Sequence, residues 1–169
     1  CALLFAVLLL SACSQQSGTS TTPSDPKMDA YVSDLMSKMT VEEKIGQLNL
    51  PVAGFSMTGT KESKGVEEKI RAGQVGGIFV AYGPEKVRKI QEIAVNESRL
   101  KIPLIFGLDV IHGHRTIFPI PLGMSATWEP ALLERASRIA ATEASAEGLN
   151  WTFSPMVDIA RDPRWGRIS

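Results

Sequence analysis

One side chain of this 169-residue chain is well placed for binding chemistry: Asp109, which directly follows the apolar run 102–108. A carboxylate at the C-terminal end of a buried strand lies at the open edge of a sheet. There it can accept hydrogen bonds from two neighbouring hydroxyl groups, such as those of a sugar ring. Two structural roles compete with this one, a helix N-cap and an ion pair with Arg115. The residues alone leave these roles open.

Two histidines follow this carboxylate. His112 and His114 are two positions apart, so on a strand they would share one face. Zinc sites need at least three protein ligands, and no third ligand stands at a typical metal spacing. A structural role is therefore the favoured interpretation of both histidines, and no metal is expected.

A second cluster of polar residues lies in segment 158–167. It combines three arginines, two aspartates and a tryptophan, namely Asp158, Arg161, Asp162, Arg164, Trp165 and Arg167. Guanidinium groups offer forked donors to hydroxyls or carboxylates, and an indole offers a face for stacking. The alternative is a network of ion pairs that fixes the loop. Both interpretations are compatible, because an arginine that orients a ligand needs a carboxylate of its own.

Four apolar runs predict the strands that would position these side chains. They are 45–51, 75–81, 102–109 and 151–158. The runs are continuous rather than alternating, which is typical of strands in a parallel sheet covered by helices. The last two runs end at a carboxylate, so polar groups are expected along the carboxyl edge of the sheet.

Helical patterns alternate with these runs. Helices are predicted from 27 to 39, from a Thr40–Glu43 capping box, around 66–72, and over 84–100 and 130–147. Pro84 and Pro130 stand in first turns, and Gly73 and Gly148 stand where a left-handed residue ends a helix. Three glutamates of the last helix are interpreted as solvated or helix-pairing charges; they are Glu134, Glu143 and Glu147.

Two α/β architectures fit this alternation, an open doubly wound sheet and a closed barrel. No G-x-G-x-x-G turn follows any predicted strand, which weakens a dinucleotide-binding fold. The long segments after the strands are typical of barrel enzymes, which need about 250 residues for eight strand-helix units. We therefore expect the N-terminal half of a (β/α)8 TIM-type barrel, incomplete in this chain.

The first 26 residues differ from the rest. Residues 1–12 carry no charge and are interpreted as the remnant of a signal peptide. Residues 10–13, Leu-Ser-Ala-Cys, resemble the lipobox of bacterial lipoproteins, which implies cleavage before Cys13 and lipid attachment to it. Residues 13–26 are rich in Ser, Thr and Pro and predict a disordered tether, and residues 27–169 form the folded part. Lipidation would leave no thiol for a disulfide.

The charge balance limits the class of partner. The chain has 18 basic and 18 acidic side chains, 44% hydrophobic residues and 21% charged residues. Affinity for phosphate backbones grows with the number of neutralising cations, so a net charge of zero argues against a nucleic-acid partner. The membrane is expected as a partner only through lipid on Cys13.

Several motifs together resemble the N-terminal barrel of glycoside hydrolase family 3, of the periplasmic beta-glucosidase type. They are Gly107-Leu108-Asp109 with His112-Gly113, Thr116-Ile117-Phe118-Pro119, Ser154-Pro155 and Asp162-Pro163-Arg164-Trp165-Gly166-Arg167. The resemblance implies a barrel followed by an α/β sandwich and activity on β-linked sugars without metal or organic cofactor. It also implies that Asp109 and Arg167 bind hydroxyls of the terminal sugar.

The resemblance assigns no nucleophile and no acid/base residue to this chain, because the family's positions for them lie beyond Ser169. The expected function is hydrolysis of terminal β-glucosyl residues by a bacterial cell-envelope protein, periplasmic or an outer-membrane lipoprotein, with the fragment itself inactive. The alternatives are a beta-xylosidase or N-acetylglucosaminidase of the same family, and a non-catalytic carbohydrate-binding lipoprotein.

Overall fold

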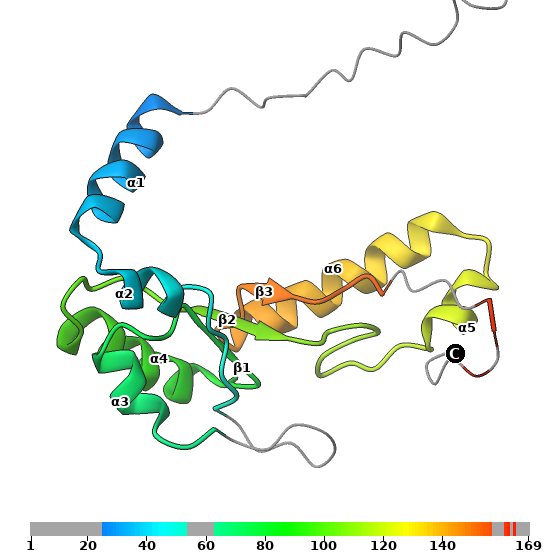
Figure 1. Cartoon of the computed structure of the whole chain (residues 1–169). Helices are drawn as coiled ribbons and strands as arrows, with labels where there is room; N and C mark the ends of the chain where they lie inside the picture. The colour runs from blue at the N-terminus through cyan, green and yellow to red at the C-terminus, as the bar shows by residue number, and fades with distance from the viewer. Residues whose placement is uncertain (1–24, 54–62, 157–160, 163, 165–169) are drawn as a thin grey trace, which may run out of the picture. The chain divides into compact units, whose positions relative to one another are not determined.

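The computed structural model describes residues 25–53, 63–156, 161, 162 and 164. The chain divides into two compact units, Cys1–Lys38 and Met39–Ser169. In the first unit the structure describes helix α1, Pro26–Lys38, which confirms the helix predicted from residue 27 (Figure 1). No helix among the described residues is long and apolar enough to cross a bilayer.

The second unit alternates helices and strands. Its elements are α2 (Val41–Gly46), α3 (Val66–Arg71), β1 (Gly77–Phe79), α4 (Pro84–Glu92), the π-helical turn η1 (Ile93–Glu97), β2 (Ile105–Leu108), α5 (Pro121–Ser125), α6 (Pro130–Ala146) and β3 (Trp151–Thr152). The predicted proline starts are confirmed, since Pro84 and Pro130 open α4 and α6. Gly73 and Gly148 have positive φ angles, 71° and 87°, as their predicted helix-ending role requires. The short helix α5 was not predicted.

The strands form a parallel sheet in the order β1-β2-β3. Each strand pairs with the next one along the chain. A parallel bridge between Val52 and Phe79 extends this order on the other side of β1. The predicted α/β class with parallel strands is confirmed.

The strand predicted over 45–51 is wrong. Ile45 and Gly46 belong to α2, and the side chains of Ile45 and Leu48 are 64% and 87% exposed. The capping box explains the difference, because Thr40 accepts a hydrogen bond from the Glu43 N–H and starts a helix that takes up the beginning of the apolar run. The end of the run does lie along β1, because the N–H groups of Gly77 and Phe79 donate to the carbonyls of Asn49 and Pro51, and a bridge forms at Val52. In the run 151–158, β3 covers two residues, and 157 and 158 lie outside the described residues.

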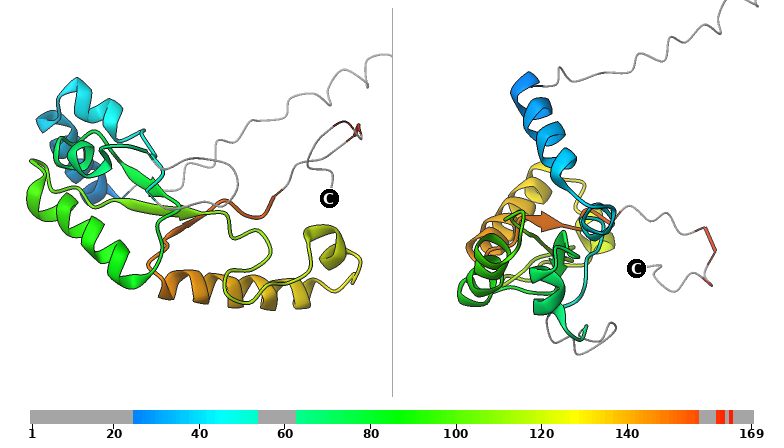
Figure 2. Two further views of the ribbon diagram at one scale, coloured as in Figure 1. Left: turned by 90° about the horizontal axis from the view of Figure 1, so that it is seen from below. Right: turned by 60° about the vertical axis from the view of Figure 1, so that its left-hand side comes forward.

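Helices pack on one face of this sheet. Ile78 and Phe106 are register partners, so they share a face, and their side chains are 0% and 1% exposed. The helical residues in the same core include Ile70 of α3, Ile93 and Ala94 of η1, and Ala140 and Ala144 of α6. Figure 2 shows α4 and α6 on the same side of the strands.

The other face of the sheet carries little cover among the described residues. It presents Ile105 and Trp151, whose side chains are 48% and 44% exposed. Phe79 and Phe153 make an edge-to-face contact on this face, with ring centroids 5.4 Å apart. Gly107 lies beneath them, and a Cβ there would come within 2.9 Å of the Phe153 ring. The sheet is therefore helix-covered on one face and largely open on the other.

The buried carboxylate Glu43 ties the start of α2 to the segment after η1. One carboxylate oxygen accepts from Arg99 Nε at 2.9 Å, and the other accepts from the Thr40 N–H at 2.9 Å and from Arg99 Nη2. The Arg99 guanidinium, with the Thr40 N–H, holds the pKa of Glu43 below its ordinary value of 4.5. The charged form of Glu43 is thus favoured in the folded protein.

Glu43→Gln is expected to lower the free energy of unfolding at pH 7. A carboxyl whose pKa is lower in the folded state stabilises above its unfolded pKa, and the stabilisation is lost as the pH falls through the folded pKa. The difference between parent and variant should therefore be largest at neutral pH and shrink below about pH 4.5. Urea unfolding at pH 7 and at pH 3.5 measures it. Glu42→Gln, at the exposed neighbouring position, is the control, and a parent–Glu43→Gln difference that does not change with pH would contradict the prediction.

Candidate functional site

Asp109 lies where the sequence predicts it. It directly follows β2, which ends at Leu108, and its side chain is exposed at the carboxyl edge of the sheet. The two competing structural roles are not observed. Arg115 pairs with Glu147 instead, and no described helix uses Asp109 as its N-cap. Among the described residues, none covers the Asp109 carboxylate, which is therefore accessible to a ligand.

The segment after Asp109 folds back on itself as a hairpin, residues 112–118. The Phe118 N–H donates to the His112 carbonyl at 2.8 Å, and Gly113 forms an antiparallel bridge with Ile117. Gly113 has a φ of 126°, and a Cβ at this position would lie 2.0 Å from the Thr116 carbonyl oxygen. Only glycine fits such a close approach without displacing the backbone.

The two histidines have structural contacts, as the sequence favoured. His112 Nδ1 lies 2.9 Å from the Phe118 carbonyl, which can only accept, so Nδ1 carries the proton. His114 is 7% exposed, with its Nε2 3.1 Å from Glu147 Oε2 and its ring edge-to-face with Tyr82. Among the described residues, no group of three His, Cys, Asp or Glu side chains is arranged to hold a metal ion.

The three glutamates of the predicted helix 130–147 differ from one another, and the prediction for Glu143 and Glu147 is wrong. Glu134 is a helix-pairing surface charge as predicted, 3.1 Å from Arg138 and 72% exposed. Glu143 instead binds the hairpin: it accepts from the backbone N–H groups of Arg115 and Thr116 at 2.8 and 2.7 Å and from the Thr116 hydroxyl at 2.6 Å. These three donors, with the Thr116 hydroxyl the strongest cause, lower the pKa of Glu143.

Glu147 is the second carboxylate that binds the hairpin. One oxygen accepts from Arg115 and the other faces His114. Burial raises the pKa of Glu147, but His114 and Arg115 outweigh this effect, and the net pKa is lowered. The sequence signal for this pair is the i, i+4 spacing of Glu143 and Glu147, which places both on one face of a helix.

Only part of the arginine-rich segment lies within the described residues. Arg164 donates to Asp162 through its backbone N–H and its guanidinium, both at 2.9 Å to Oδ1, and these bonds lower the pKa of Asp162. This pair matches the ion-pair interpretation. Asp158, Trp165 and the predicted sugar-binding Arg167 lie outside the described residues, as does Cys13.

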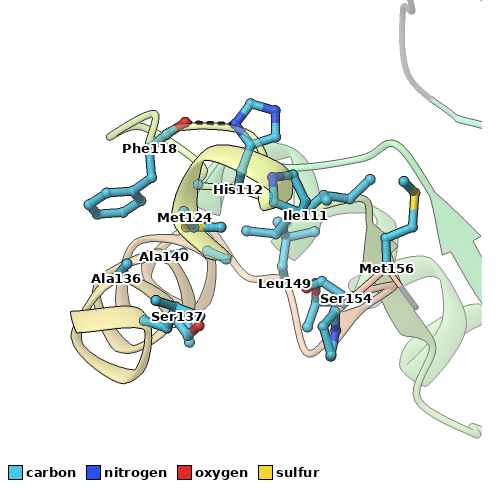
Figure 3. A pocket seen from close by; sticks show the side chains of 18 of the residues that line it. Ile111, His112, Phe118, Met124, Ala136, Ser137, Ala140, Leu149, Ser154 and Met156 are labelled. Carbon is cyan, nitrogen blue, oxygen red and sulfur yellow. Dashed lines mark hydrogen bonds between the residues drawn. The ribbon is translucent and has the colours of Figure 1, made fainter. Parts of the chain in front are cut away.

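A cavity of about 550 Å³ lies beside the hairpin, between α6 and the segment after β3 (Figure 3). Ala136, Ser137 and Ala140 line one side of it, and Ser154 and Met156 line another. Its walls are mostly apolar and include neither Asp109 nor any other carboxylate. Among the described residues, the cavity and the Asp109 carboxylate are therefore separate features, and Asp109 remains the candidate binding residue.

Comparison with known proteins identifies the family. The family model described as "Glycosyl hydrolase family 3 N terminal domain" matches residues 40–169. The chain is 47% identical over 141 residues to the periplasmic beta-glucosidase of Salmonella typhimurium, covering 83% of this chain and 18% of that protein. It is 31% identical to the lysosomal beta glucosidase of Dictyostelium discoideum, covering 83% of this chain and 20% of the relative.

A solved structure gives the same result. The crystal structure of a beta-glucosidase from Listeria innocua in complex with isofagomine matches with a TM-score of 0.69 and 36% identity, over 82% of this chain and 19% of that chain. The chain thus spans about a fifth of the length of these relatives. The resemblance noted in the sequence is confirmed, and the chain belongs to glycosyl hydrolase family 3.

Proposed function

We propose that the whole protein hydrolyses terminal non-reducing β-D-glucosyl residues of β-glucosides and oligosaccharides. The observation that carries the proposal is the family match over residues 40–169, which includes the exposed Asp109 at the end of β2. The relatives named above are beta-glucosidases, and other Listeria innocua structures hold glucose or laminaribiose. These names support a β-glucoside as the substrate.

The proposed mechanism is retaining double displacement. It needs two carboxyl groups about 5 Å apart, one to attack the anomeric carbon and one to protonate the leaving oxygen. We assign neither role to Asp109, Asp158 or Asp162, because the resemblance to the family gives these residues other roles. Asp109 and Arg167 hold the terminal sugar, and their hydrogen bonds strengthen as the ring flattens toward the transition state. The nucleophile and the acid/base residue belong to the rest of the protein.

We further propose that the parallel sheet is the first part of a (β/α)8 barrel. Val52, β1, β2 and β3 are neighbours in chain order, whereas the strand order of a doubly wound sheet reverses at a switch point. Helices cover the face of Ile78 and Phe106, and the face of Ile105 and Trp151 is largely open. A barrel has helices on its outer face only, and its inner face is filled by side chains from all its strands.

For the N-terminal residues and the domain boundaries, the proposal rests on the sequence. Residues 1–12 are a signal-peptide remnant, residues 13–26 a tether lipidated at Cys13, and residues 27–169 part of the barrel domain. The protein is placed in the bacterial periplasm, held at a membrane by its lipid. The periplasmic names of the relatives from Salmonella typhimurium and Dickeya chrysanthemi support this compartment.

The whole protein is expected to hydrolyse p-nitrophenyl β-glucoside with a higher kcat/KM than the β-xyloside or the N-acetyl-β-glucosaminide. The measurement is initial rates on the three substrates at equal protein concentration. A preference for the xyloside would favour the beta-xylosidase alternative. A relative that is 30% identical and named beta-glucosidase/beta-xylosidase supports this alternative. Binding of glucose without turnover of any of the three would indicate a non-catalytic carbohydrate-binding protein.

A further inference from the structure

We propose that Glu143 and Glu147 are positioning residues of the sugar-binding site. By holding the hairpin 112–118 against α6, they fix the segment that begins at Asp109 and so fix the direction of its carboxylate. This inference rests on the proposed function, because it adds two residues to the binding site that Asp109 serves. Neither glutamate contacts the sugar in this proposal.

Glu143 holds the hairpin backbone directly. Its Oε2 accepts from two successive backbone N–H groups, those of Arg115 and Thr116, and its Oε1 accepts from the Thr116 hydroxyl. Hydrogen bonds to a charged acceptor are stronger than neutral ones. Three such bonds converging on one carboxylate fix both the position and the orientation of the hairpin tip.

Glu147 holds the same tip through side chains. It is one turn further along the chain, beyond the last residue of α6, and its side chain is 11% exposed. Arg115 contacts one of its oxygens, and the buried His114 ring contacts the other while packing edge-to-face on Tyr82. The two carboxylates therefore accept hydrogen bonds from Arg115 and Thr116, and His114 lies against one of them without a hydrogen bond.

Two side chains of the hairpin tip are largely exposed to solvent. The Ile117 side chain is 66% exposed and that of Arg115 is 70% exposed. The helix that carries Glu143, in contrast, is fixed in the core by Ala140 and Ala144. Three residues, 110–112, join Asp109 to Gly113, where the hairpin closes. Val110, the first of these residues, is 6% exposed and belongs to the core, so in this proposal a displacement of the tip reaches the carboxylate at the end of β2 through a packed segment.

The test uses the whole protein with an aryl β-glucoside, comparing Glu143→Ala, Glu147→Ala and Glu143→Gln with the parent. Misplacing a binding group by about 1 Å can cost about a hundredfold in rate, so each alanine variant is expected to lower kcat/KM about 10- to 100-fold, mainly through kcat. Glu143→Gln should stay within about threefold, because an amide oxygen accepts both N–H bonds and the Thr116 hydroxyl can turn to accept from the amide NH₂. Glu134→Gln, on the exposed surface of the same helix, is the matched control and should match the parent.

A double variant separates positioning from general stability. If Glu143 acts through Asp109, Glu143→Ala should cost no further activity, within about threefold, once Asp109→Ala is present. If the kcat/KM losses of the two single variants multiply in the double variant, Glu143 has an independent structural effect and the proposal is overturned. A kcat/KM of Glu143→Ala within about threefold of the parent overturns it as well. If Glu143→Ala fails to unfold cooperatively, Thr116→Val replaces it, and an unchanged kcat/KM there overturns the proposal. A parent without glucosidase activity refutes the proposed function itself, whereas an active parent with unaffected variants refutes only the positioning role.

Discussion

Asp109→Ala is expected to lower kcat/KM for an aryl β-glucoside by roughly 10²- to 10⁴-fold. The carboxylate is exposed at the end of β2 and is proposed to accept hydrogen bonds from two sugar hydroxyls. A hydrogen bond to a charged group contributes about 1.5–3 kcal/mol, and each 1.4 kcal/mol corresponds to about a tenfold change in rate. Two such bonds, used most fully in the transition state, give the expected range.

The same variant should leave the fold intact. Asp109 makes no hydrogen bond or ion pair within the part of the chain that the structure describes, and substitutions at such surface positions usually change the free energy of unfolding by no more than about 0.5 kcal/mol. Kinetics and thermal unfolding of the purified whole protein measure the two effects separately. Asp109→Asn, which keeps the shape and one acceptor oxygen, should lose less than the alanine variant. A kcat/KM of Asp109→Ala within about threefold of the parent means that the binding role is wrong.

Much of the architecture is predictable because the signals for it are local. The Thr40–Glu43 capping box, the prolines that open α4 and α6 and the glycines that follow α3 and α6 each act over three or four residues. The apolar runs at 75–81 and 102–109 each contain an observed strand. The place of Asp109 follows from the same logic, since it depends only on where β2 ends.

The errors arise where one local signal overrides another or where contacts are remote in sequence. An apolar run over 45–51 looks like a strand, but the capping box starts a helix that runs through Ile45. Glu143 and Glu147 contact residues 27 to 33 positions away, and no periodicity within α6 reveals that partner. Their i, i+4 spacing shows that they share a face but not what that face meets. Arg167 and Cys13 stay predictions, because they lie outside the described residues.

Phe106→Ala is expected to lower the free energy of unfolding of the whole protein by about 3–5 kcal/mol. Phe106 is 1% exposed and packs in the core between the sheet and its helices, opposite its register partner Ile78. Removing a buried ring loses its transfer free energy and leaves a cavity that the surrounding helices fill only in part. Urea unfolding followed by tryptophan fluorescence measures the change.

The adjacent residue provides a control that also tests the proposed barrel. Ile105 lies on the opposite face of β2 and is 48% exposed in this chain. A barrel would enclose that face, so in the whole protein Ile105→Ala should cost about 2–5 kcal/mol, as for a buried aliphatic side chain. If that face instead stays in solvent, the cost should remain below about 1 kcal/mol, in the range of ordinary surface substitutions. A small loss for Ile105→Ala beside a large loss for Phe106→Ala would contradict the barrel, because a closed barrel buries the side chains on both faces of its strands.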